Sequence, residues 1–114
     1  MVNQAESLDR VFAALSDPTR RRIVERLARG PLSIGEIAVG FELSQPAISK
    51  HIKVLERSGL LARTIEGRVH RCTLDPGVMQ QAAGWIDTQR AFWNATLDRL
   101  DSLLTSPQKR KKRP

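Results

Sequence analysis

Residues 33–55 have the sequence SIGEIAVGFELSQPAISKHIKVL, and this stretch decides the fold. Ser33 and Glu36 match a capping box, in which the two side chains satisfy free backbone N–H groups at a helix start. This pattern predicts a short helix that Gly40 ends. Ser44 is then predicted to cap a second helix, because its hydroxyl can accept a hydrogen bond from a backbone N–H group in the first turn. A short helix, a tight corner and a longer helix indicate a helix-turn-helix.

The second helix is predicted to run over residues 45–57, and Gly59 is predicted to close it. Ile48, Ile52 and Leu55 follow the spacing i, i+4, i+7, so they share one face of this helix and are expected to pack inward. Two further apolar residues are expected to fill the corner between the helices: Phe41 and Leu43.

The opposite face of the second helix is polar and free of carboxylates until Glu56. A glutamine such as Gln45 can bond bidentately to adenine, a serine such as Ser49 can bond several bases, and lysines can reach guanine or phosphate. The second helix of a helix-turn-helix lies in the major groove of DNA, so this face is predicted to contact DNA. The alternative is an ordinary solvated face, since lysines are common on protein surfaces.

The flanking sequence predicts the rest of the fold. Apolar residues at helical spacing predict a first helix over residues 5–15. Asp17-Pro18 is a cap and first-turn signal for the next helix. Short strands are predicted over 61–64 and 69–74, and Asp75-Pro76 begins a long helix to about residue 104. The predicted fold is mainly α with a small β-hairpin, a winged helix-turn-helix in the order α-α-α-α-β-β-α.

The predicted hairpin is basic around its turn at Gly67. An arginine at such a tip, here Arg68, can reach the minor groove or the DNA backbone. For His70 and Arg71 a solvated turn and a DNA contact are equally good readings, because strand alternation sends some side chains away from DNA.

Three arginines begin the second predicted helix at residues 20–22. Positive charge at a helix N-terminus opposes the helix dipole, which asks for an explanation. Contact with DNA phosphate is one, and ion pairing with Glu25 or Glu6 is the other.

Composition fits one domain whose excess positive charge lies mostly in a C-terminal tail. The chain has 114 residues and a net charge of +7, of which five charges belong to residues 109–113. We expect one domain over 1–106 and a disordered basic tail over 107–114. The single cysteine, the polar N-terminus and the lack of a long apolar run predict a cytoplasmic protein with no membrane contact. Paired carboxylates, a Gly-rich phosphate loop and a Ser–His–Asp set are missing, so no catalytic residue and no enzyme activity are predicted.

The chain resembles the ArsR/SmtB family of bacterial winged-helix repressors. The resemblance rests on residues 17–24 (DPTRRRIV), 32–38 (LSIGEIA), 44–55 (SQPAISKHIKVL) and 58–61 (SGLL), and extends loosely over 8–104. The resemblance implies a homodimer that binds a pseudo-palindromic operator in double-stranded DNA and leaves it when an effector binds the protein. The sequence points to no particular effector. With the residues that it matches, the predicted DNA-binding set is Ser44, Gln45, Pro46, Ser49, Lys50, His51, Lys53, Arg68 and Arg71.

The chain departs from the metal-sensing members that the family is best known for. The positions that hold cysteines in a Cys-x-Cys pattern look like Ser33 and Gly35 here, and residues 77–104 contain no histidine. Soft and borderline metals need thiolate or imidazole ligands, so no metal site and no cofactor are predicted. The last helix resembles instead the non-metal branch, whose members are often autorepressors.

The last helix carries an apolar, aromatic stripe that is too broad for one thin core to cover. We expect it to form a dimer interface with the first helix across a two-fold axis; a ligand pocket lined by Trp85 and Trp93 is the alternative. The predicted interface residues are Leu8, Val11, Phe12, Trp85, Phe92, Trp93, Leu97 and Leu100.

The function predicted from these features is sequence-specific binding of double-stranded DNA by a dimeric transcriptional regulator. Repression rather than activation follows from the family resemblance alone. A winged helix used for protein or RNA contact is the competing function, and a salt-insensitive partner interaction would favour it.

Overall fold

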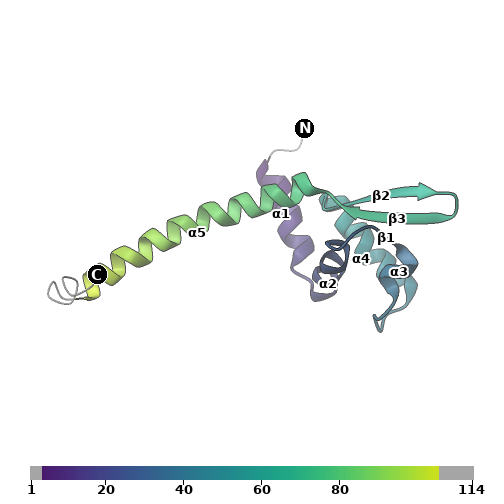
Figure 1. The fold of residues 1–114 in the computed structure, drawn as a ribbon, viewed down its shortest axis with the longest axis horizontal. Helices are drawn as coiled ribbons and strands as arrows, with labels where there is room; N and C mark the ends of the chain where they lie inside the picture. Colours follow the sequence, from purple (N-terminus) through teal and green to yellow (C-terminus); the bar gives the residue numbers. More distant parts are fainter. Residues whose placement is uncertain (1–3, 106–114) are drawn as a thin grey trace. The chain divides into compact units, whose positions relative to one another are not determined.

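The computed structural model describes residues 4–105, and these form five helices and three strands (Figure 1). They divide into two compact units between Ala82 and Ala83. The basic tail predicted over 107–114 lies outside the described residues, and the single domain predicted over 1–106 stays a prediction. The elements are α1 (Gln4–Leu15), α2 (Pro18–Leu27), β1 (Leu32–Ser33), α3 (Ile34–Ala38), α4 (Gln45–Ser58), β2 (Leu61–Glu66), β3 (Val69–Leu74) and α5 (Pro76–Leu104).

The helix starts are the ones that the sequence predicts. The Asp17 carboxylate accepts a hydrogen bond from the backbone N–H of Arg20 at 3.0 Å, which caps α2 and lowers the pKa of that carboxyl. Ser33 and Glu36 form both halves of the capping box, at 3.1 and 2.8 Å. The pKa of the Glu36 carboxyl is lowered because it accepts the hydrogen bond from the Ser33 backbone N–H. Each cap supplies a partner for backbone N–H groups that the helix itself leaves free.

The wing is part of a three-stranded antiparallel sheet in the order β1-β3-β2. The hairpin pairs Leu61 with Leu74 at its base. The two-residue strand β1, absent from the predicted order, pairs Leu32 with Cys72 and Ser33 with Arg71. Ser33 therefore ends a strand and caps α3 at the same time.

The core of the first unit is aliphatic, as the low aromatic content requires. Ile48, Ile52 and Leu55 of α4 are completely buried, which confirms the predicted inner face of that helix. Phe41 packs against the core, but Leu43 is 42% exposed, so the predicted filling of the corner is right for Phe41 and wrong for Leu43. The other buried apolar residues are Val11, Ala14, Ile23, Val24, Leu27, Ile37, Leu60, Leu61, Cys72 and Ala82.

Val11 requires a correction to the predicted dimer interface. Its side chain is only 1% exposed within a single chain and belongs to the core. Helical spacing placed it beside Leu8 and Phe12, which are partly exposed and pack at the edge of the same core. Val11 has no surface to offer a second chain and is removed from the interface set.

Candidate DNA-binding surface

Helix α4 is held at both ends by the residues that the sequence predicts. The Ser44 hydroxyl accepts a hydrogen bond from the Ala47 backbone N–H at 3.2 Å, and Pro46 occupies the first turn, where the missing N–H costs nothing. Gly59 ends the helix with φ at +88°, in the left-handed region that favours glycine. The helix is therefore a fixed element with a defined first turn.

The polar face of α4 is open. Gln45, Lys50 and Lys53 are exposed and Ser49 is half-buried. Lys50 and Lys53 lie opposite the buried isoleucines, and Gln45 is exposed in the first turn, where a helix in the major groove places its base contacts. A shallow cavity of about 290 Å³ adjoins Gln45 and Ser49.

The wing shares that cavity with α4, because Arg68 and His70 also line it. Gly67 adopts φ of +64° and makes the tight turn, which leaves Arg68 exposed at the tip. Arg71 is engaged instead across the hairpin, with its Nε 3.2 Å from the Glu66 carboxylate. The structure thus brings Gln45 and Ser49 of α4 together with Arg68 at the wing tip, while Arg71 has a partner within the wing.

The base of the wing is tied to α4 by Arg63. Its guanidinium donates to the Glu56 carboxylate at 2.8 Å and lies 3.3 Å from the Nδ1 of His70. Glu56, the one carboxylate in the sequence of α4, is therefore engaged with a cation. His70 is held at the same point.

His51, a predicted DNA contact, is also bound by side chains of its own chain. Its Nδ1 accepts a hydrogen bond from the Arg20 guanidinium at 3.2 Å and lies 3.8 Å from the Asp17 carboxylate, and its side chain is 23% exposed. This ring is held at the start of α2 by groups of the same chain. These contacts support a structural role for His51, and its contact with DNA stays a prediction.

The arginine run of α2 is explained by the end of α1. Arg20 donates through Nε to the Ala14 carbonyl at 2.7 Å, and Arg21 donates to the Leu15 carbonyl at 2.8 Å. The last carbonyls of a helix lack partners within it and carry partial negative charge, so cations are favourable there. The charges that are misplaced for α2 are well placed for α1, a role that neither predicted explanation included.

Arg26 positions the helix-turn-helix, and no local pattern in the sequence predicts this role. Its guanidinium donates to the backbone carbonyls of Ile37 at 2.6 Å, of Glu36 at 3.2 Å and of Val39. These carbonyls lie at the end of α3. The group also lies 5.6 Å from the centre of the Phe41 ring. One side chain of α2 thereby fixes the end of α3 and the corner that leads to α4.

The substitution Arg26→Met is expected to lower the free energy of unfolding by about 1–3 kcal/mol, because carbonyls that now accept from a charged donor lose it. Arg22→Met is the matched control. Arg22 lies 4.5 Å from the centre of the same Phe41 ring, and it is expected to cost about 0.5–1 kcal/mol for that contact. Urea unfolding measures both, and equal costs would show that the carbonyl contacts of Arg26 contribute little.

The residues at the family's cysteine positions do not fit a metal. The Ser33 hydroxyl is engaged in the capping box, and Gly35 has no side chain. Within residues 4–105, no three His, Cys, Asp or Glu side chains are grouped so as to hold a metal ion. Cys72 is buried, and burial raises the pKa of its thiol, which disfavours the thiolate that a metal needs.

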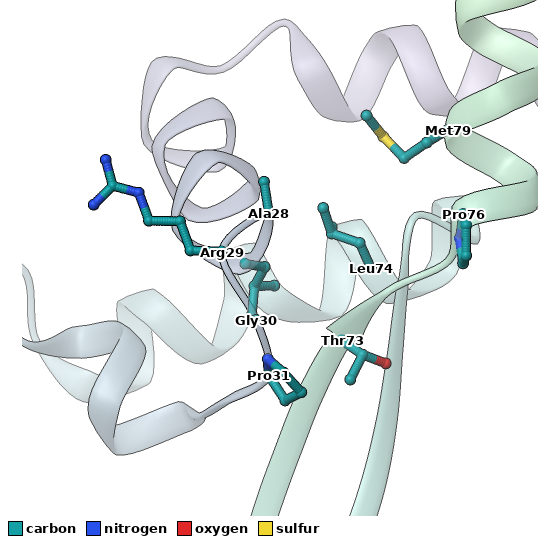
Figure 2. A pocket seen from close by; sticks show the side chains of 9 residues that line it. Ala28, Arg29, Gly30, Pro31, Thr73, Leu74, Pro76 and Met79 are labelled. Atoms are coloured by element: carbon teal, nitrogen blue, oxygen red, sulfur yellow. The ribbon is translucent and has the colours of Figure 1, made fainter.

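A pocket of about 460 Å³ lies between the end of α2, the end of β3 and the start of α5 (Figure 2). Leu27, Leu74 and Met79 give it apolar walls. Arg29 extends away from Leu74 and Thr73 in Figure 2, so its charge does not point into the pocket.

No helix within the described range 4–105 is both long and apolar enough to span a membrane.

A polar, basic helix face beside a basic wing tip defines a winged helix-turn-helix DNA-binding protein. Residues 15–64 match a family model described as a helix-turn-helix domain. The chain is 43% identical over 100 residues to the HTH-type transcriptional regulator Rv2034 of Mycobacterium tuberculosis, covering 88% of this chain and 91% of the relative. It is 34% identical over 79 residues to the transcriptional repressor SdpR of Bacillus subtilis, covering 69% and 88%.

A solved structure of an ArsR-like transcriptional regulator from Rhodococcus sp. RHA1 superposes with a TM-score of 0.73 at 30% identity, covering 92% of this chain and 99% of that one. The chain belongs to the ArsR/SmtB family of winged helix-turn-helix transcriptional regulators, and its function is regulation through DNA binding.

Proposed function

We propose that the chain is a homodimeric repressor that binds a pseudo-palindromic operator and needs neither a metal nor catalysis to do so. The observation that supports this most is the exposed set of base-reading side chains on α4 over a fully buried inner face. In each subunit, Gln45 and Ser49 read bases while Lys50 and Lys53 hold guanine or phosphate. Repression is the activity named for the relative SdpR, and we extend it to this chain, acting in the cytoplasm.

Dimerisation is supported by the second unit taken by itself. In α5, positions 86, 89, 93, 96, 100 and 103 recur at alternating spacings of three and four, the pattern of a helix that pairs with another helix, and four of the six are apolar while Gln89 and Thr96 are polar. Trp93 is 60% exposed and Leu100 49% exposed in a single chain. An apolar stripe of this length on a soluble domain marks an interface. The remaining exposed apolar residues of α5 are Trp85, Ile86, Phe92, Leu97, Leu103 and Leu104.

Substitution of Gln45 tests the base-reading role. Gln45→Ala is expected to weaken binding to the protein's own promoter DNA about 5- to 150-fold, since a bidentate contact to a base contributes about 1–3 kcal/mol. Binding to scrambled DNA should change little. Lys50→Ala should weaken both, because a phosphate contact carries no sequence information. Fluorescence anisotropy titrations over a salt series measure these affinities.

The matched control is Gln80→Ala, the same change at an exposed position at the start of α5. It should leave both affinities as they are. If promoter affinity were unchanged in Gln45→Ala and in Lys50→Ala, the assignment of the site to α4 would be wrong. Removal of residues 107–114 separates the tail from the site: promoter selectivity should survive, and only the salt dependence should become shallower. Complete loss of selectivity, with a partner that binds independently of salt, would favour a protein- or RNA-interaction module.

A further inference from the structure

A second basic surface, which shares no residue with the predicted DNA-contact set, lies between α1 and the C-terminal half of α4. It is a pocket of about 300 Å³, within the size range of small-molecule sites. Three arginines line it, each from a different element: Arg10 of α1, Arg20 of α2 and Arg57 of α4. Between them lie the apolar side chains of Ala13, Ala14 and Val54.

The three arginines differ in what they already bind. Arg20 is fixed, because its guanidinium donates to the Ala14 carbonyl and to the Nδ1 of His51. Arg10 and Arg57 are exposed, and neither has a hydrogen bond or ion pair within the part of the chain that the structure describes. Two unpaired cations thus face the same small cavity as a third that is held in place. Among residues 4–105, no carboxylate lines this cavity to neutralise them.

We infer that this pocket binds a small organic anion: a carboxylate on a short apolar body. The arginine fork matches the two oxygens of a carboxylate, which favours paired hydrogen bonds to it. The alanines and Val54 offer an apolar surface to the rest of the ligand. A bound anion of this kind bridges α1 and α4. This pocket shares no residue with the predicted DNA-contact set, and its occupancy does not depend on the proposed operator binding.

The test is a chemical-shift titration of the ¹⁵N-labelled full chain without DNA, at about 0.15 M salt so that exposed charges are screened. Benzoate is the probe, benzamide is its uncharged counterpart, and inorganic phosphate is an anion without an apolar body. Benzoate is expected to shift the amides of Ala13, Ala14 and Val54 saturably, with a Kd on the order of 1 mM for so small a ligand. Benzamide and phosphate should bind these positions at least about tenfold more weakly.

The variant Arg10→Gln with Arg57→Gln should weaken benzoate binding by at least about tenfold. The control, Arg29→Gln with Arg99→Gln, removes the same net charge from other exposed positions and should bind as the parent does. The inference is overturned if benzoate does not saturate these amides, if benzamide binds equally well, or if both double variants lose affinity alike.

DNA phosphate is the other possible source of an anion, and a second arm separates it. If the arginines serve DNA, the Arg10→Gln, Arg57→Gln variant will lower the slope of log affinity against log salt by about 0.9 for each lost phosphate contact. The protein alone would then show no saturable benzoate binding, which overturns the inference. Because the titration contains no DNA, failure of the proposed repressor function would leave its result unaffected.

Discussion

Ile52→Ala is expected to lower the free energy of unfolding by about 2–5 kcal/mol. Ile52 is completely buried at the middle of the inner face of α4, within the core of the first unit. Truncation to alanine removes apolar contact and leaves a cavity, and both terms destabilise the fold. A domain of this size has a total free energy of unfolding of about 5–15 kcal/mol, so the side chain of Ile52 alone accounts for a large part of it.

Urea unfolding at one fixed protein concentration measures this effect, since the stability of a dimer depends on concentration. Lys53→Ala is the matched control: the neighbouring residue in the same helix, exposed to solvent, with an expected change within about 0.5 kcal/mol. A cost below about 1 kcal/mol for Ile52→Ala would mean that the inner face of α4 is loosely packed, which contradicts its complete burial.

The elements that could be predicted from sequence are those decided by nearby residues. Asp17, Ser33 and Ser44 each cap a helix within three residues of themselves, as predicted. The turn at Gly59 needs a left-handed φ, which glycine adopts at least cost. The inner face of α4 follows from spacing along one helix. These interactions join residues that are close in the sequence, so local sequence patterns predict them.

The features that could not be predicted depend on residues far apart in the chain. The strand β1 has two residues, too few for an alternating pattern, and exists because β3 lies beside it. Arg26 reaches the carbonyls of α3 across 10 to 13 positions, and His51 meets Arg20 across 31. Each side chain alone is equally typical of a solvated surface. Only the packed fold decides between the two roles.

The candidate DNA surface lies between these cases. The exposure of Gln45 and Lys50 was predictable, because the opposite face of the same helix is apolar. The meeting of α4 with Arg68 at one cavity required the wing to fold back beside the helix. The contact of Arg71 with Glu66 depends on the register between two strands, which the alternation along one strand does not give.

Trp93→Asp is expected to convert the proposed dimer into a monomer and to reduce promoter affinity by at least about 100-fold. Trp93 is 60% exposed in the single chain and lies on the apolar stripe of α5. In a two-fold interface each substitution occurs twice. The interface therefore loses two indole rings and gains two carboxylates. Without the dimer the second half-site no longer binds at a high effective concentration, and that advantage is about 10²- to 10⁴-fold.

Sedimentation velocity on the same samples measures the assembly, and anisotropy titration measures the binding. Ala95→Asp is the matched control, because it places the same charge in the same helix two residues along, outside the stripe and exposed. Alanine is the best helix former, so Ala95→Asp loses at least as much helix propensity as Trp93→Asp, and a dimer lost only in Trp93→Asp belongs to the interface. A Trp93→Asp protein that still sedimented as a dimer would show that α5 pairs through another face. A monomer that kept its full promoter affinity would show instead that each subunit reads its site alone, because avidity would then contribute nothing.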